Sequence, residues 1–164
     1  MRKHFFASAA LLLIACLSSG LVVKGQRFID KSYSKVMTSL KKYNTGNDST
    51  SVRFSNTAKT IKMEVGGTGS QPAIFEYFFN SNDKCISEKA TASCDSCYKK
   101  YLTDLLSKKK YGWIRLNENQ YISAYKWKLM IELPVNEEKQ LFYNLMKVTW
   151  NKETYAMLLE GRQK

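Results

Sequence analysis

Histidine is almost absent from this chain of 164 residues, in which His4 is the only one. Ser-His-Asp triads, Cys-His pairs, His-Glu-x-x-His zinc sites and histidine general bases all require imidazole groups. The glycine-rich stretch 66–69 lacks the Gly-x-x-x-x-Gly-Lys-Ser/Thr pattern of a phosphate-binding loop, and it precedes a predicted strand rather than a helix. Acidic residues are scattered, and the adjacent pair Glu137 and Glu138 falls in a predicted turn. We therefore expect no enzymatic activity, no cofactor and no metal.

Acidic residues are also few, because 14 Asp and Glu stand against 26 Lys and Arg, for a formal net charge of +12. The lysines are distributed along the chain. Their tightest run, Lys108 to Lys110, falls at the end of a predicted helix, where cations are favoured by the helix dipole. We expect no nucleic-acid partner, and acidic surfaces such as anionic lipid head groups or polysaccharide fit this charge better.

Long hydrophobic runs are limited to the N-terminus. Arg2 and Lys3 precede an apolar stretch over residues 5–15, and no further charge follows before Lys24. This pattern predicts a signal peptide over residues 1–25 and a single domain over residues 26–164. The protein is therefore expected to be exported, to the periplasm, the outer membrane or the extracellular space.

Two processing routes fit the signal segment. Cleavage before Gln26 would remove His4 and three basic residues and lower the formal net charge from +12 to +9. Alternatively, Leu13-Ile14-Ala15-Cys16 resembles a bacterial lipobox, in which Cys16 becomes lipidated and anchors the protein to a membrane. An uncleaved membrane anchor is disfavoured, because residues 18–20 (Ser-Ser-Gly) interrupt an apolar segment that is barely long enough to cross a membrane.

Hydrophobic periodicity predicts two amphipathic helices, over residues 28–44 and 94–106, and a short terminal helix over 153–160. Alternating apolar residues predict about four strands between the first two helices and three after the second. The clearest alternation, over residues 121–133, predicts one long strand. The expected fold class is α+β, with an antiparallel sheet of about seven strands and two helices on one face.

A faint internal repeat accompanies this order of elements. Residues 33–40 match residues 98–105 at a constant shift of 65, with Tyr, Lys, Thr and Leu identical. Two explanations remain open for the match: a duplicated helix-plus-strands unit, or a coincidence between two helical patterns.

The predicted layout over residues 28–150 resembles two groups of small domains, PepSY-type periplasmic domains and exported inhibitors of β-lactamases. The export segment and the Lys-, Asn- and Tyr-rich sequence are also similar to small envelope proteins of Bacteroidetes. The resemblance implies a binding or inhibitory role with a protein or other envelope partner. It assigns no functional residue.

Cys85, Cys94 and Cys97 remain after cleavage at either site, whereas Cys16 remains only if the chain is lipidated there. Cys94 and Cys97 open the second helix, where the helix dipole lowers a thiol pKa, as in disulfide oxidoreductases. However, the two prolines of the chain provide no convincing cis-proline loop, and a zinc site would lack a fourth ligand. Structural disulfide and redox-active dithiol therefore both remain open.

We expect Cys85 to pair with Cys94 rather than with Cys97. Such a bond would tie the second helix to the preceding strand and stabilise by roughly 2–3 kcal/mol. A Cys94–Cys97 bond would constrain only one helical turn.

The 21 aromatic residues concentrate on predicted strand faces, which is typical of a core rather than of a sugar-stacking platform. Phe75, Tyr77 and Phe79 share one face, as do Tyr125 and Trp127. The sequence thus favours a non-enzymatic exported binding or inhibitory protein. The alternative is a thiol-disulfide redox protein that uses Cys94 and Cys97.

Overall fold

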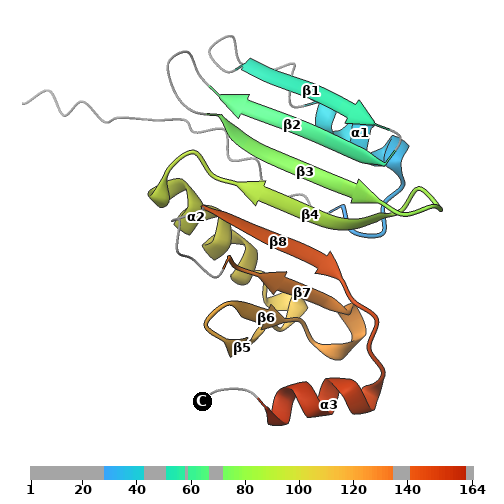
Figure 1. Cartoon of the computed structure of the whole chain (residues 1–164), viewed down its shortest axis with the longest axis vertical. Coiled ribbons are helices and arrows are strands. Elements are labelled where there is room, and N and C mark those ends of the chain that lie inside the picture. The colour runs from blue at the N-terminus through green and yellow to red at the C-terminus, as the bar shows by residue number, and fades with distance from the viewer. Residues whose placement is uncertain (1–27, 43–50, 58, 67–71, 135–140, 162–164) are drawn as a thin grey trace, which may run out of the picture.

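The computed structural model describes residues 28–42, 51–57, 59–66, 72–134 and 141–161. Within these residues the chain forms three α-helices and one antiparallel sheet of eight strands, in the order β1-β2-β3-β4-β8-β7-β6-β5 (Figure 1). The predicted signal segment, Cys16, the cleavage site before Gln26 and the pair Glu137-Glu138 lie outside this part of the chain. In the described part, no helix is long and apolar enough to cross a membrane.

The described chain consists of two similar halves. Each half is a helix followed by four antiparallel strands. The first half contains α1 (Tyr33–Lys41), β1 (Ser51–Thr57), β2 (Thr60–Gly66), β3 (Ala73–Phe79) and β4 (Cys85–Thr91). The second contains α2 (Asp95–Leu106), β5 (Ile114–Asn117), β6 (Gln120–Ile122), β7 (Leu129–Glu132) and β8 (Phe142–Lys147), and α3 (Lys152–Glu160) follows it. The halves join where β4 pairs with β8, so β1 and β5 form the two edges of the sheet. The predicted α+β class and helix-plus-strands repeat are therefore present.

α1 and α2 cover one face of the sheet, as predicted. Along β3, Ala73, Phe75, Tyr77 and Phe79 are buried and alternate with half-buried residues. Leu40 of α1 and Leu105 of α2, which correspond at the 65-residue shift, are both buried against the sheet, Leu40 in the core of the first half and Leu105 in that of the second. Each large apolar side chain removed from water in this way contributes roughly 1.5–3 kcal/mol.

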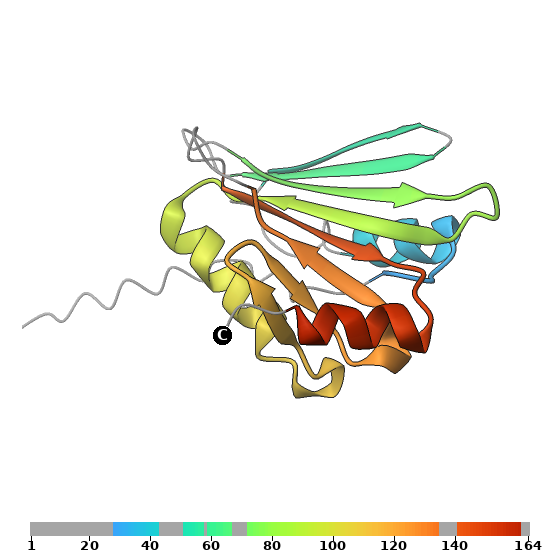
Figure 2. The same cartoon turned by 60° about the horizontal axis from the view of Figure 1, so that its bottom comes forward.

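α3 packs on the other face of the sheet. Its residues Tyr155, Leu158 and Leu159 contact a cluster that includes Ile122 and Met130. Met130 alternates with Leu129 and Ile131, which belong to the core beneath α2, so its side chain lies on the opposite face. Figure 2 shows α3 in front of the strands of the second half.

The prediction of one long strand over residues 121–133 is wrong, because the chain turns back within it. β6 ends at Ile122, a 3₁₀ turn occupies Tyr125–Trp127, and β7 begins at Leu129. Lys128 adopts a left-handed conformation with φ of 51°, which reverses the chain direction. The buried Ser123 then closes the turn, because its Oγ accepts a hydrogen bond of 2.9 Å from the Leu129 N–H. The reversal accounts for an eighth strand.

The first helix is shorter than predicted and begins at Tyr33. Phe28 is buried, and Asp30 adopts a left-handed conformation with φ of 68°. The Glu88 carboxylate of β4 accepts hydrogen bonds from the backbone N–H groups of Phe28 and Ile29. These contacts hold the first described residues in a turn on the helix side of the sheet, in which the Lys31 N–H donates to the Phe28 carbonyl at 2.7 Å.

Candidate functional site

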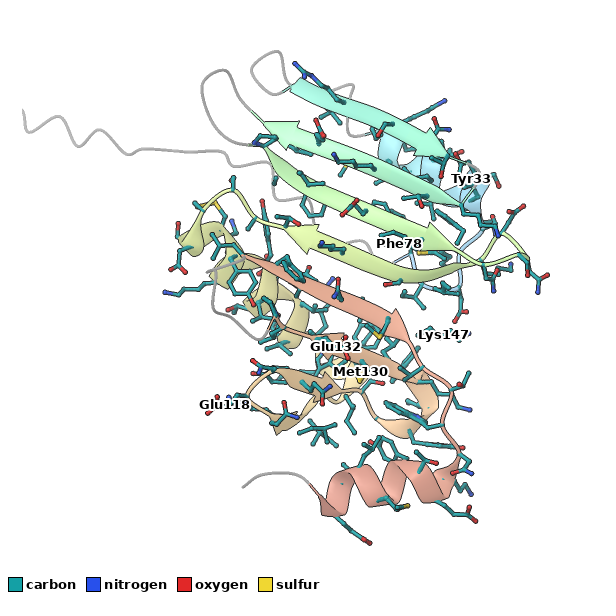
Figure 3. The ribbon with its side chains drawn as sticks, in the orientation of Figure 1. Tyr33, Phe78, Glu118, Met130, Glu132 and Lys147 are labelled. Carbon is teal, nitrogen blue, oxygen red and sulfur yellow. A yellow bond between two sulfur atoms is a disulfide. The ribbon has the colours of Figure 1, made fainter. Side chains whose placement is uncertain are left out.

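The candidate site lies on the sheet face opposite to α1 and α2. We call this face the open face. In β3 it carries Ile74, Glu76 and Phe78, all half-buried, and in β7 it carries Met130 and Glu132. Figure 3 views this face and labels Phe78, Met130 and Glu132 on it. α3 covers only its end, near β5, β6 and β7.

A continuous row of polar side chains crosses the open face, within the strands on the β1 side and at the strand ends in β7, β6 and β5. Each member pairs directly with its neighbour on the next strand, as in Lys62 with Glu76 and Glu132 with Asn144. From β1 to β5 the row contains Ser55, Lys62, Glu76, Lys89, Asn144, Glu132, Gln120 and Asn117. We call it the polar row. Its first half alternates in charge, whereas amide side chains predominate in its second half.

One ion pair orders the charged half of this face. Lys62 Nζ lies 2.7 Å from Glu64 Oε1, two positions along the same strand. The hydrogen bond between them raises the pKa of Lys62 and lowers the pKa of Glu64. Both groups therefore stay charged at neutral pH. The pair is solvent-exposed, so it orients side chains more than it stabilises the fold.

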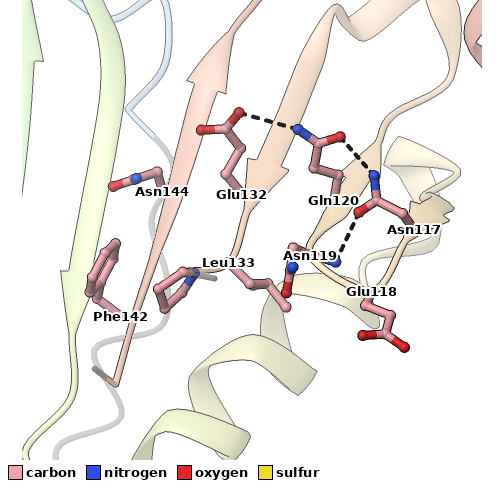
Figure 4. Close-up of a pocket in the computed structure, with 9 residues that line it drawn as sticks. Asn117, Glu118, Asn119, Gln120, Glu132, Leu133, Phe142 and Asn144 are labelled. Carbon is pink, nitrogen blue, oxygen red and sulfur yellow. Dashed lines mark hydrogen bonds between the residues drawn. The ribbon is translucent and has the colours of Figure 1, made fainter. Parts of the chain in front are cut away.

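The amide-rich half of the polar row forms the wall of a pocket with a volume of about 750 Å³ (Figure 4). We call it the amide pocket. Its polar lining consists of four amides and two carboxylates, Asn117, Asn119, Gln120, Asn144, Glu118 and Glu132. Its apolar lining consists of Leu133, Pro134 and Phe142. Strands β5 to β8 supply five of these residues, the tight turn between β5 and β6 supplies Glu118 and Asn119, and Leu133 and Pro134 directly follow β7.

Hydrogen bonds hold several of these side chains in place. Asn117 Nδ2 donates to Gln120 Oε1 at 3.0 Å, and Gln120 Nε2 lies 3.5 Å from Glu132 Oε1. Asn117 Oδ1 accepts from the Asn119 N–H at 2.9 Å, which closes the turn (Figure 4). Lys89 Nζ lies 4.4 Å from the centre of the Phe142 ring. Three strands thus share one connected set of polar contacts.

The structure joins Cys94 to Cys97, so the predicted Cys85–Cys94 pairing is wrong. The reason is the length of β4, which begins at Cys85. Its seven extended residues span about 20 Å, whereas a disulfide needs Cα atoms within about 7 Å. The bonded pair has a Cα–Cα distance of 5.1 Å and lies at the start of α2.

Cys94 is also the N-cap of α2, because its Sγ accepts a hydrogen bond of 3.1 Å from the Cys97 N–H. Cys94 and Cys97 are half-buried. Cys85, in contrast, is a free thiol that is fully buried beneath the sheet. Burial raises the pKa of Cys85, and the neighbouring Glu88 raises it further. Cys85 is therefore an inert core residue rather than a site residue.

The aromatic residues divide between core and surface. Phe75, Tyr77 and Phe79 are buried, which confirms their predicted role in the core. Tyr125 and Trp127 do not share a strand face, because both lie in the 3₁₀ turn, where Trp127 is 38% exposed. Trp127 Nε1 donates to the Lys110 carbonyl at 2.7 Å, which ties this turn to the 3₁₀ turn Lys109–Tyr111 that follows α2.

Neither the polar row nor the amide pocket was expected from the sequence. The sequence signal that could have predicted them is the type of polar residue, charged or amide, that alternates with the apolar residues in each strand. Among the described residues, no cluster of three or more Asp, Glu, His or Cys side chains is arranged to hold a metal ion.

Comparison with known proteins finds no match to this chain among protein-family models, curated proteins or solved structures.

Proposed function

We propose that this chain is a non-enzymatic binding or inhibitory protein of the cell envelope and that it binds its partner with the open face of its sheet. The observation that carries the proposal is the contrast between the two sheet faces. One is covered by α1 and α2, whereas the other carries the polar row across the strands and the amide pocket in its second half, and α3 covers only its end. Backbone pairing holds these side chains rigidly, which lowers the entropy lost on binding.

The composition of the open face also supports a binding role. Lys62, Glu76 and Lys89 alternate in charge, so a partner would be recognised by individual hydrogen bonds and ion pairs rather than by net charge. Half-buried apolar residues, among them Ile74 and Phe78, flank the row. Such a mixture of apolar and polar groups is typical of reversible protein interfaces.

Site-directed photo-crosslinking in the native host tests this proposal. A photoreactive amino acid at Ser87, which lies on the open face at the centre of the sheet, should form a discrete adduct in the envelope fraction. The matched control is the same amino acid at Lys100, which is exposed on α2 on the other side of the sheet. Adducts from Lys100 instead of Ser87, or none from Ser87, would contradict the proposal.

A redox role of Cys94 and Cys97 is the second candidate, and the placement of their disulfide favours it. The Cys97 N–H and the N-terminus of α2 would stabilise a Cys94 thiolate after reduction. In such a reaction two thiols of a client protein lose two electrons and two protons and form a disulfide. The Cys94–Cys97 disulfide takes these up and becomes two thiols.

A stoichiometric thiol-oxidation assay distinguishes this candidate from the first. If the redox role holds, the protein should oxidise a reduced dithiol peptide, and a variant with both Cys94→Ser and Cys97→Ser should not, at unchanged circular dichroism. Loss of envelope crosslinking in the same variant would favour the redox role over the binding role. Oxidation no faster than by glutathione disulfide would exclude the redox role.

A further inference from the structure

We propose that the amide pocket binds a neutral sugar residue. This inference rests on the proposed binding function, because the pocket is part of the open face. It names the chemistry of the group that this part of the face recognises, namely a ring with several hydroxyl groups and no charge.

The hydrogen-bonding groups of the pocket match hydroxyl groups. Each sugar hydroxyl both donates and accepts, and a side-chain amide offers both functions from one group. Among the described residues, the side-chain amides of Asn119 and Asn144 form no hydrogen bond, so they are available to a ligand. Glu132 uses Oε1 toward Gln120, and its second oxygen can accept from a hydroxyl group.

The connected contacts make this part of the pocket rigid before a ligand arrives. Asn117, Gln120 and Glu132 form a chain of side-chain hydrogen bonds across β5, β6 and β7. Their orientations are therefore set in advance, and binding a sugar costs little side-chain entropy.

The charges of the pocket argue against an anion. No Lys or Arg belongs to its described lining, although the chain as a whole carries a formal net charge of +12. Lys89, on the neighbouring strand β4, is directed to the Phe142 ring, with Nζ 4.4 Å from the ring centre. A phosphate or carboxylate ligand would therefore find no cationic partner in the lining.

A cationic ligand fits less well than a neutral one. An ammonium group or a metal ion needs carboxylates that converge on one point. In Figure 4 the Glu118 and Glu132 side chains lie apart and point in different directions, with Gln120 and Asn117 between them. Amides thus dominate the space between the two carboxylates.

The apolar wall completes the match. Phe142, Leu133 and Pro134 line the pocket beside the amides. One face of a sugar ring presents C–H groups, which pack against aromatic and aliphatic surface while the hydroxyl groups face polar partners. The volume of about 750 Å³ is in the usual range for ligand pockets and leaves room for a ring within a longer glycan.

Titration of the ¹⁵N-labelled full chain tests the inference by NMR. Glucose, galactose, N-acetylglucosamine and cellobiose are added separately at millimolar concentrations, and ethanolamine, calcium chloride and inorganic phosphate serve as charged probes. At least one sugar should shift the side-chain amide signals of Asn119, Gln120 and Asn144, and the charged probes should not. No shift with any of the four sugars, or stronger shifts with a charged probe, would overturn the inference.

Three variants and one control make the result specific. Gln120→Ala and Asn144→Ala should each weaken sugar binding about fivefold to tenfold, as expected for one lost hydrogen bond. Glu132→Gln keeps an acceptor for Gln120 and should weaken sugar binding only severalfold, whereas it would abolish binding of a cation. Asn82→Ala, in the exposed turn between β3 and β4, is the matched control and should leave binding unchanged. Equal weakening in the control would overturn the assignment to this pocket.

Failure of this inference and failure of the proposed function give different results. If the sugars fail but Ser87 on the open face still forms its adduct in the envelope, the pocket assignment is wrong and the binding function stands. If both fail, the open face is not a binding surface.

Discussion

Ser123 is the only buried polar residue in the described part of the chain, and it decides where the second half of the sheet turns. Its Oγ accepts from the Leu129 N–H at 2.9 Å and donates to the Ala124 carbonyl at 3.2 Å. Its backbone N–H donates to the Leu129 carbonyl at 2.9 Å. One small side chain thus satisfies backbone groups that the turn would otherwise bury without a partner.

Replacing Ser123 with alanine should therefore lower the free energy of unfolding by about 1–3 kcal/mol, because the Leu129 N–H loses its acceptor inside the protein. Urea unfolding measures the change. Ser55→Ala, on the exposed edge strand β1, is the control and should change stability by less than about 0.5 kcal/mol. Equal effects of the two substitutions would show that the Ser123 bond contributes nothing.

Cys85 should make stability depend on pH in the alkaline range. Its pKa is raised by burial, so the folded thiol stays protonated above pH 9, whereas the unfolded thiol ionises near its ordinary pKa of 9.0. The stabilisation is fully present below pH 9 and is lost as the pH rises above it, by up to about 1.4 kcal/mol per pH unit. Chemical unfolding of the wild type and of Cys85→Ala at pH 8 and pH 10 measures this pH-dependent contribution of Cys85 to the free energy of unfolding.

The Cys85→Ala variant should lose less stability than the wild type between these pH values, because other titrating groups, such as the tyrosines, are common to both proteins. In the native wild type, Cys85 should also resist thiol reagents until the protein unfolds. Identical pH dependence in the two proteins would refute the prediction.

At the scale of elements, an N-terminal cap and a few apolar contacts hold α3 on the open face. Asn151 caps the helix, because its Oδ1 accepts from the Thr154 N–H at 2.8 Å. Tyr155 packs on Trp150, with ring centres 5.4 Å apart. The nine-residue helix is too short to be stable without these contacts.

Asn151→Ala should therefore loosen α3 and lower the free energy of unfolding by roughly 1 kcal/mol. Hydrogen exchange of the α3 amides should accelerate, while exchange in β3 and β4 changes little. The control is Lys152→Ala, which removes an exposed cation from the positive end of the helix dipole and should be neutral or slightly stabilising. Unchanged exchange in Asn151→Ala would mean that packing alone holds α3.

The whole molecule is two helix-plus-four-strand halves that share one sheet through the pairing of β4 with β8. The cores of the two halves meet around this seam, where Tyr143 and Ile29 contact both. The halves should therefore unfold together rather than one after the other.

Leu145→Ala tests this coupling. Leu145 is 1% exposed and pairs with Glu88 across the seam, so its truncation should cost about 2–5 kcal/mol. Trp113 and Trp127 lie in the second half and Trp150 packs against its strands, so tryptophan fluorescence reports on that half while circular dichroism reports on the whole chain. The two signals should give one coincident transition in wild type and variant. Met157→Ala, with 70% of the residue exposed, is the control.

Export is a prediction about the whole chain. In protein isolated from the native host, intact mass should correspond to a chain that begins at Gln26 or at a lipidated Cys16, because the basic start and the apolar run over residues 5–15 form a signal segment. A cytosolic species that begins at Met1 would contradict it.

The sequence by itself determined the α+β class, the two covering helices and most strand positions. In β3 and within the observed bounds of α1 and α2, the local pattern of apolar residues agrees with the final burial, so local information is sufficient there. The same patterns misled where long-range contacts competed with them. Residues 121–133 alternate like one strand, but the Ser123 and Lys128 turn is more favourable because it lets β7 pair with β8.

Tertiary structure alone decided the site. Asn117, Gln120, Glu132 and Asn144 lie up to 27 positions apart in the chain, and only the strand order brings them together. The disulfide was decided in the same way, because the extended length of β4 separates Cys85 from Cys94 and leaves Cys97 as the partner within reach. Local propensity sets which elements form, but strand order and strand length set which side chains meet.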